Sequence, residues 1–328
     1  MKPFTLTTGT AVALSLMAGS AVAQDFTARL SLDVPEGNPK FVAAQQFADG
    51  VSERTDGAVE IKLFPNSLLG GEVESAEGIR LGSIQAGILT SSVLAQWVPE
   101  VQVLDLPFVF ESDAHSVAVN EPLTEELQDE FADAGFHLLG FTPNGARALI
   151  SKDEIKVPAD VEGKKMRVIQ SDLHVDLWKT AGANPVPIPA PEIYNSMQTG
   201  VVDFFDNTAS NYENEKWYEV APYFTKLNHI YAMGSWVVSQ SWWESLPEEY
   251  QTAVEEAAAE AQQAQPELQA EADEEALSAT EEEGATVVSD LDRQPWIEKM
   301  SPVREKYSQE IPQAESLLDV IEQANPES

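Results

Sequence analysis

Short runs of alternating hydrophobic and polar residues recur along the chain, separated by segments with helical spacing. Phe26–Leu32 alternates as a strand does, and Val59–Phe64 repeats the pattern until Pro65 ends it. Between them, Pro39–Arg54 places apolar residues every three to four positions, which is typical of a helix with one buried face. A further helix at 72–81 and a strand at 86–90 complete a β-α-β-α-β order. This order predicts an α/β fold with a largely parallel sheet.

A second series of α/β units follows from residue 157. We expect strands at 165–169, 185–188 and 201–205, with helices at 172–181 and 191–199. Around this series the patterns predict strands at 137–141, 146–151, 223–228 and 230–239, and helices at 122–134 and, as a pair, 295–323. The alanine-, glutamate- and glutamine-rich segment 247–283 favours a long helix, which Pro266 is expected to kink or split.

The first 23 residues have the pattern of a secretory signal peptide. Lys2 precedes the apolar run Ala11–Ala18, and Ala21-Val22-Ala23 provides the small residues of a cleavage site. The apolar run is too short to remain as a membrane-spanning helix. The chain has no cysteine, which excludes disulfides, thiolate chemistry and the lipid anchor of a bacterial lipoprotein. We therefore expect a free periplasmic protein without direct membrane insertion.

Charge and length narrow the class of protein further. The net charge of -36 excludes nucleic acid as a partner, because binding to phosphates needs a basic surface. About 305 residues remain after the signal peptide, which exceeds one ordinary hydrophobic core and predicts two lobes. Arg167 is one of only seven arginines and lies in a predicted strand. Its guanidinium can bind both oxygens of a carboxylate at once. Arg167 is therefore part of either an anion-binding site or a surface ion pair.

Motifs of catalysis and metal binding are missing from the sequence. It contains no Walker loop, no G-x-S-x-G and no H-E-x-x-H, and its four histidines lack the spacing of metal ligands. We therefore expect a protein that is not an enzyme and that needs neither a cofactor nor a metal.

Six ordered segments carry a resemblance to a known family. They are Phe64–Glu72 (FPNSLLGGE), Val103–Phe110 (VLDLPFVF), Asn144–Arg147 (NGAR), Pro158–Arg167 (PADVEGKKMR), Gly182–Pro187 (GANPVP) and Glu192–Asp203 (EIYNSMQTGVVD). In this order and spacing the chain resembles the dicarboxylate-binding (DctP-like) solute-binding proteins of TRAP transporters, the tripartite ATP-independent periplasmic systems. The likeness covers nearly all of the chain after the signal peptide.

The resemblance implies an α/β, two-lobed periplasmic binding protein fold, with strands crossing between the lobes and a long lobe-spanning helix. It places 24–145 plus about 233–270 in the N-terminal lobe and 146–232 plus about 271–328 in the C-terminal lobe. It implies capture of a small organic carboxylate by cleft closure, and delivery to TRAP membrane permease subunits. Two ligand classes can pair a carboxylate with one arginine: sugar acids, such as uronates, and C4-dicarboxylates.

The resemblance also assigns candidate ligand-binding residues. Arg167 matches the arginine that forms a paired salt bridge with the ligand carboxylate. Arg147 matches a second arginine near the cleft, which contacts the ligand, supports the site or forms an interlobe salt bridge. Asn207 matches an asparagine that faces the ligand, with a turn or capping role as the alternative. Phe204 and Phe205 depart from the family pattern before Asn207 and are expected to reshape the sheet core or narrow the pocket.

Three further candidates have a structural alternative. Glu72 matches a family acid that receives ligand hydroxyl or amine groups, although a helix N-terminus also stabilises an acid. Trp236 and Tyr212 wall the pocket or flank the hinge, or else they pack in the core.

Two other functions stay open from the residues. The acidic composition suits a saline habitat, and an aromatic box would favour a zwitterionic osmolyte or a sulfonate, such as ectoine or taurine. A secreted hydrolase with paired carboxylates is the remote alternative.

Overall fold

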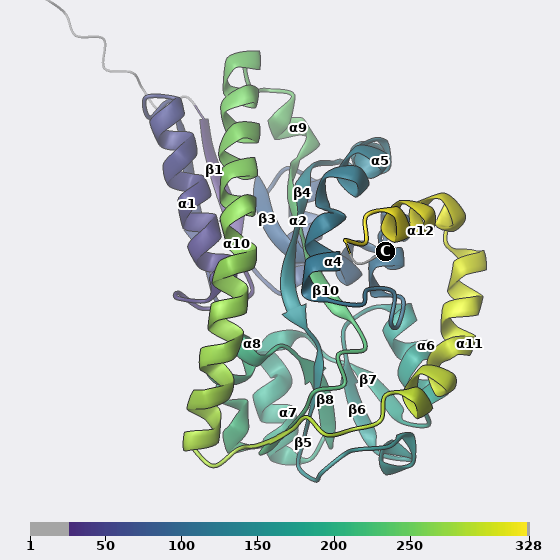
Figure 1. Cartoon of the computed structure of the whole chain (residues 1–328). Coiled ribbons are helices and arrows are strands. Elements are labelled where there is room, and N and C mark those ends of the chain that lie inside the picture. The colour runs from purple at the N-terminus through teal and green to yellow at the C-terminus, as the bar shows by residue number, and fades with distance from the viewer. Residues whose placement is uncertain (1–25, 327–328) are drawn as a thin grey trace, which may run out of the picture.

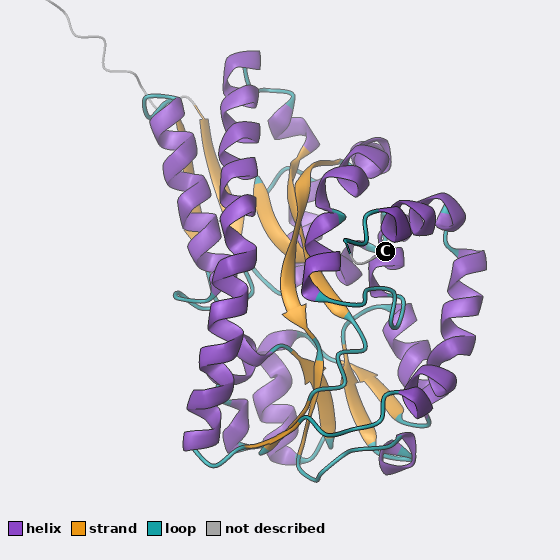
Figure 2. Ribbon diagram, in the orientation of Figure 1, coloured by secondary structure: helices purple, strands orange, loops and turns teal. Residues whose placement is uncertain are grey.

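Two β-sheets organise residues 26–326, which are the residues that the computed structural model describes (Figures 1 and 2). The predicted signal peptide lies outside them. In spatial order, the first sheet contains β2 (Val59–Phe64), β1 (Phe26–Ser31), β3 (Ala86–Thr90), β10 (Tyr231–Ser239) and β4 (Phe136–Ala146). The second contains β11 (Thr286–Val288), β9 (Tyr223–Thr225), β5 (Ala148–Ser151), β8 (Phe204–Asn207), β6 (Lys165–Val168) and β7 (Asn184–Pro187). We call each sheet with its covering helices the first and second lobe.

Helices cover both sheets. Those that pack on the first are α1 (Pro39–Arg54), α2 (Glu72–Arg80), α3 (Ser91–Leu94), α4 (Asp113–Ala118), α5 (Asn120–Asp133) and α9 (Gln240–Trp243). Around the second lie α6 (Asp172–Ala181), α7 (Ile193–Thr199) and α8 (Ala209–Asn214). The chain ends with α10 (Glu248–Glu282), α11 (Gln294–Glu310) and α12 (Ala314–Gln323). The expected α/β fold is confirmed.

Two strand-to-strand connections cross between the lobes. β4 of the first sheet passes through Arg147 directly into β5 of the second, and β9 of the second leads through residues 226–230 into β10 of the first. The two crossings bond to each other, because Arg147 N donates to Ile230 O at 2.9 Å. The expected crossing strands are therefore present, and Arg147 lies at the junction of the two sheets.

The long helix α10 runs beside both lobes, against α1 and β4 of the first and α8 and β11 of the second (Figure 1). Of the two outcomes expected at Pro266, a kink or a split, the split does not occur, since the helix continues from Glu248 to Glu282. Buried glutamines hold the helix on both sides of the proline: Gln262 Nε2 and Gln265 Nε2 donate to backbone carbonyls of β4, and Gln269 Nε2 donates to Ser210 Oγ on α8.

Two boundaries differ from the sequence-based expectation. The strand expected at 201–205 forms at 204–207, because Gly200 has a φ of 74° and Val201 is half exposed in the turn that follows. The resemblance places about 271–328 in the C-terminal lobe, yet α12 contacts α5 of the first lobe. Its apolar face buries Leu317 and Ile321 in a core shared with first-lobe residues.

Candidate functional site

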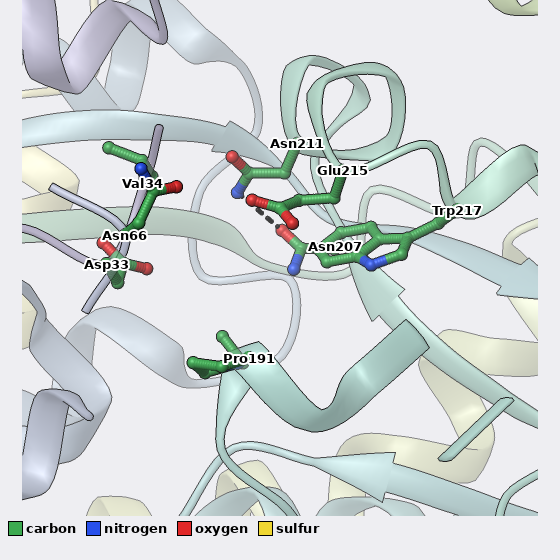
Figure 3. Close-up of a pocket in the computed structure, with 9 residues that line it drawn as sticks. Asp33, Val34, Asn66, Pro191, Asn207, Asn211, Glu215 and Trp217 are labelled. Carbon is green, nitrogen blue, oxygen red and sulfur yellow. Dashed lines mark hydrogen bonds between the residues drawn. The ribbon is translucent and has the colours of Figure 1, made fainter. Parts of the chain in front are cut away.

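A cavity of about 240 Å³ lies between the lobes. Figure 3 shows lining residues facing one another across the gap: Asp33, Val34 and Asn66 lie on one side and Asn207, Asn211, Glu215 and Trp217 on the other. Ala190 and Pro191 complete the lining. A narrow extension shares Asp33, Ala190 and Pro191 and reaches Glu72 and Arg167. The cleft is smaller than the roughly 300–1,000 Å³ of pockets for drug-sized ligands, which suits a small solute.

Arg167 is a buried cation without an acidic partner. It stands on β6 with 4% of its surface exposed, and its Nε donates to Ile188 O at 2.7 Å. It forms no ion pair within residues 26–326. Burial and the neighbouring charge of Arg147 lower the pKa of Arg167 to about 10, so it stays charged at neutral pH. Its two terminal amino groups remain for an anion, and a buried charge needs such a partner.

Arg147 already has its partner. Its Nε and one terminal nitrogen bind the two carboxylate oxygens of Asp206 at 2.8 and 2.9 Å, and both residues are buried. Burial raises the pKa of Asp206, but the charge and hydrogen bonds of Arg147 outweigh it and hold that pKa well below its usual range. Burial lowers the pKa of His229, so the ring is neutral and its Nε2 donates to Asp206 at 3.1 Å. Arg147 is therefore held in a buried ion pair beside Arg167, where its charge lowers the pKa of Arg167 and the charge of Asp206 raises it.

The first lobe contributes mostly acid to the cleft. Asp33 pairs with the buried Lys40 at 2.9 Å. Glu72, the first residue of α2, accepts a bond from Thr90 N at 2.6 Å. Burial and the charge of Asp33 raise the pKa of Glu72 to about 7, against the opposite pull of Lys40. Glu72 therefore titrates near neutrality beside the anion site.

Asn207 ends β8 in the wall of the cavity and is 7% exposed. Phe204 and Phe205 precede it without lining either cavity. Phe204 packs edge-on against Trp178 in the core, and Phe205 packs edge-on behind Trp217, with ring centres 5.0 Å apart. The phenylalanine pair therefore shapes the sheet core and supports the aromatic wall of the cavity from behind.

Tyr212 and Trp236 line neither cavity. Tyr212 is fully buried and its hydroxyl donates to Ala221 O at 2.8 Å. Trp236 packs edge-on against Phe47, and its indole nitrogen donates to Thr142 Oγ1 at 2.8 Å. Both side chains pack in the core, which is one of the roles that the sequence analysis gave for them.

Sequence reasoning missed several cavity residues. Asp33 follows β1 and Asn66 follows β2, at the carboxyl ends of parallel strands, where α/β sheets bind ligands. That rule offered a signal for these two. Asn211, Glu215 and Trp217 come from α8 and the turn after it, and no sequence pattern pointed to them.

Within residues 26–326, no group of three acidic or histidine side chains is placed to hold a metal ion. None of the helices in that range is both long and apolar enough to cross a bilayer. A two-lobed fold with a buried, unpaired cation between its lobes defines a solute-binding protein for a small anion.

Comparisons with known proteins identify the family. The chain belongs to the bacterial extracellular solute-binding proteins, family 7 (DctP), whose model matches residues 30–310. It is 32% identical to a solute-binding protein of Chromohalobacter salexigens, over 88% of this chain and 87% of that protein.

Solved structures agree with this assignment. A TRAP periplasmic solute-binding protein from Roseobacter denitrificans with bound β-D-glucuronate has a TM-score of 0.86 at 29% identity, over 90% of this chain and 98% of that one. The sugar acid binding protein DctPAm from Advenella mimigardefordensis, in complex with galactonate, gives 0.87 at 29%, over 91% and 98%.

The family resemblance seen in the sequence is thus confirmed, and the protein is a TRAP-type solute-binding protein rather than an enzyme. The alternatives do not fit. Both of these relatives carry sugar acids rather than zwitterions or sulfonates. The main cavity has Trp217 as the one aromatic residue in its lining, which is no aromatic box.

Proposed function

We propose that this protein captures a sugar acid in the periplasm and delivers it to the permease subunits of a TRAP transporter. The observation that carries the proposal is Arg167, a buried guanidinium with two free amino groups at the interlobe cleft. The ligand carboxylate supplies the missing partner. Delivery to a permease follows from the family to which the chain belongs.

The rest of the cleft favours a ligand with one carboxylate and several hydroxyls. Beyond Arg167, the cleft presents the carboxylates of Asp33, Glu72 and Glu215 and the amides of three asparagines. Carboxylates and amides pair with hydroxyls. The three carboxylates repel a second carboxylate on the ligand, which argues against a C4-dicarboxylate. The sugar acids bound by the two structural relatives have this one-carboxylate, many-hydroxyl chemistry.

In our proposal Arg167, Glu72 and Asn207 contact the ligand. Arg147 acts one step away, because Asp206 occupies its guanidinium. Tyr212 and Trp236 support the two cores.

A thermal-shift and calorimetry screen tests the proposal. D-glucuronate, D-galacturonate and galactonate are compared with succinate, ectoine and taurine at equal concentration. A ligand that binds the native state raises the melting temperature by mass action. We expect sugar acids to give the largest shifts. A larger shift with succinate, or with ectoine or taurine, overturns the ligand class.

A further inference from the structure

Three asparagine side chains form a continuous chain of hydrogen bonds from one lobe to the other. Asn38 precedes α1 in the first lobe, Asn211 lies on α8 and Asn207 ends β8 in the second. Asn38 Nδ2 donates to Asn211 Oδ1 at 3.0 Å, and Asn211 Nδ2 donates to Asn207 Oδ1 at 3.0 Å. Figure 3 shows the second bond at the wall of the cavity. We call these three residues the asparagine relay.

Backbone N–H groups fix the direction of the relay at both ends, because they can only donate. Lys40 N donates to Asn38 Oδ1 at 3.0 Å, so the amide nitrogen of Asn38 is turned toward α8. Thr208 N donates to Asn207 Oδ1 at 2.8 Å, so the oxygen of Asn207 accepts two bonds. Asn211 must then present its oxygen to Asn38 and its nitrogen to Asn207. No amide in the relay can turn over without losing hydrogen bonds.

The consequence falls on Asn207. Its Nδ2 has no partner among the described residues, although the side chain is 7% exposed and lines the cavity. We propose that Asn38 and Asn211 are positioning residues that hold Asn207 as a hydrogen-bond donor to the ligand. An amide fixed in this way selects an acceptor, such as a carboxylate or hydroxyl oxygen, and disfavours an amino or ammonium group at the same place.

The relay also joins ligand recognition to closure. Asn38 belongs to the first lobe and its acceptor to the second, so separation of the lobes breaks the first bond. Asn211 is then free to turn over, and the orientation of Asn207 depends on Thr208 N alone. This inference rests on the proposed function for the nature of the ligand.

Asn214 provides a matched control on the same helix. Asn38 Nδ2 also donates to Asn214 Oδ1, at 3.3 Å. Asn214 is exposed and turns its own nitrogen to Glu213 at 2.7 Å, away from Asn207. If Asn38 only held the two lobes together, a role we call a latch, its bonds to Asn211 and to Asn214 would both matter. The relay depends on Asn211 alone.

The experiment measures D-glucuronate affinity by calorimetry in Asn211→Leu, Asn214→Leu and Asn38→Ser. Leucine has nearly the shape of asparagine without its polar atoms. Serine keeps an N-cap oxygen for Lys40 N and lacks the amide donor. We expect Kd to rise about 5- to 10-fold in Asn211→Leu and Asn38→Ser, as for one lost hydrogen bond, and less than twofold in Asn214→Leu. Melting temperatures of the ligand-free proteins check that each variant folds.

Equal losses in Asn211→Leu and Asn214→Leu overturn the relay in favour of a latch, and unchanged affinity in Asn211→Leu overturns it outright. If the wild type binds none of the sugar acids, the proposed function fails separately. The relay is then decided in the ligand-free protein by ¹⁵N NMR of the side-chain amide of Asn207. That signal is expected to move in Asn211→Leu and stay in Asn214→Leu, and an unmoved signal in Asn211→Leu overturns the relay.

Discussion

Replacing Arg167 by methionine separates what the arginine does for binding from what it does to stability. Burial and Arg147 lower the pKa of Arg167 from 12.5 to about 10. Because the folded pKa is the lower one, the protonated form destabilises the fold, and the cost is fully present at any pH below about 10. At 1.36 kcal/mol per pKa unit, the charge costs the ligand-free protein on the order of 3 kcal/mol.

Methionine keeps much of the volume of the arginine stem and removes the charge. The variant also loses the bond from Nε to Ile188 O, worth about 1 kcal/mol. A net gain of about 2 kcal/mol remains for the ligand-free fold. With an unfolding entropy of roughly 2.1 cal/mol/K per residue over about 300 residues, the melting temperature rises by about 3 °C. Binding of the sugar acid weakens at least about 100-fold, because its carboxylate loses a buried partner worth about 3 kcal/mol.

Differential scanning calorimetry without ligand and titration calorimetry with D-glucuronate measure the two effects. Arg80→Met is the control, because Arg80 is partly exposed and pairs with Glu77 on α2. We expect this control to leave affinity unchanged and not to raise the melting temperature. Near-normal affinity in Arg167→Met refutes the anion site. A lower melting temperature refutes the argument that the buried charge is unpaired.

Three further predictions concern the surroundings of the anion site. Asp206→Asn leaves Arg147 buried without its counter-charge and should lower the free energy of unfolding by about 3–5 kcal/mol. Urea denaturation measures this change, and an unchanged denaturation midpoint would contradict the prediction. The pKa of Glu72 is raised to about 7, so Glu72 ionises and repels the anion as the pH rises from 6 to 8, and sugar-acid affinity falls. Calorimetry should find that affinity depends less on pH in Glu72→Gln than in the wild type. An equal dependence of affinity on pH in the two proteins would exclude Glu72 as the cause. Asp273 on α10 accepts a hydrogen bond from Ser210 N at 2.7 Å and so caps the N-terminus of α8 from another helix. Asp273→Ala should lower the free energy of unfolding in urea by about 1–2 kcal/mol and weaken ligand binding. An unchanged free energy of unfolding would mean that α8 does not need this cap.

The periodicity of the sequence predicted most of the regular elements, because local patterns of burial are written in local residue order. At Pro266, local residue order could not decide between a kinked and a split helix, and the helix is not split. A proline removes one helical hydrogen bond, and nothing nearby in sequence shows that Gln262, Gln265 and Gln269 anchor the helix to β4 and α8. The position of α12 was missed for the same reason, since its apolar face gives no indication of which lobe it covers.

For the site, the sequence alone determined the kind of protein and one cation. The ordered family segments and the arginine at 167 needed no coordinates, because they depend on residue identity and spacing. Only the tertiary structure decided which charged and polar side chains pair with each other. It assigns Asp206 to Arg147 and leaves Arg167 free, although both are arginines near strand ends. It also brings Asn38 to Asn211 across 173 residues. Such pairings depend on distances between lobes, and residue order does not record them.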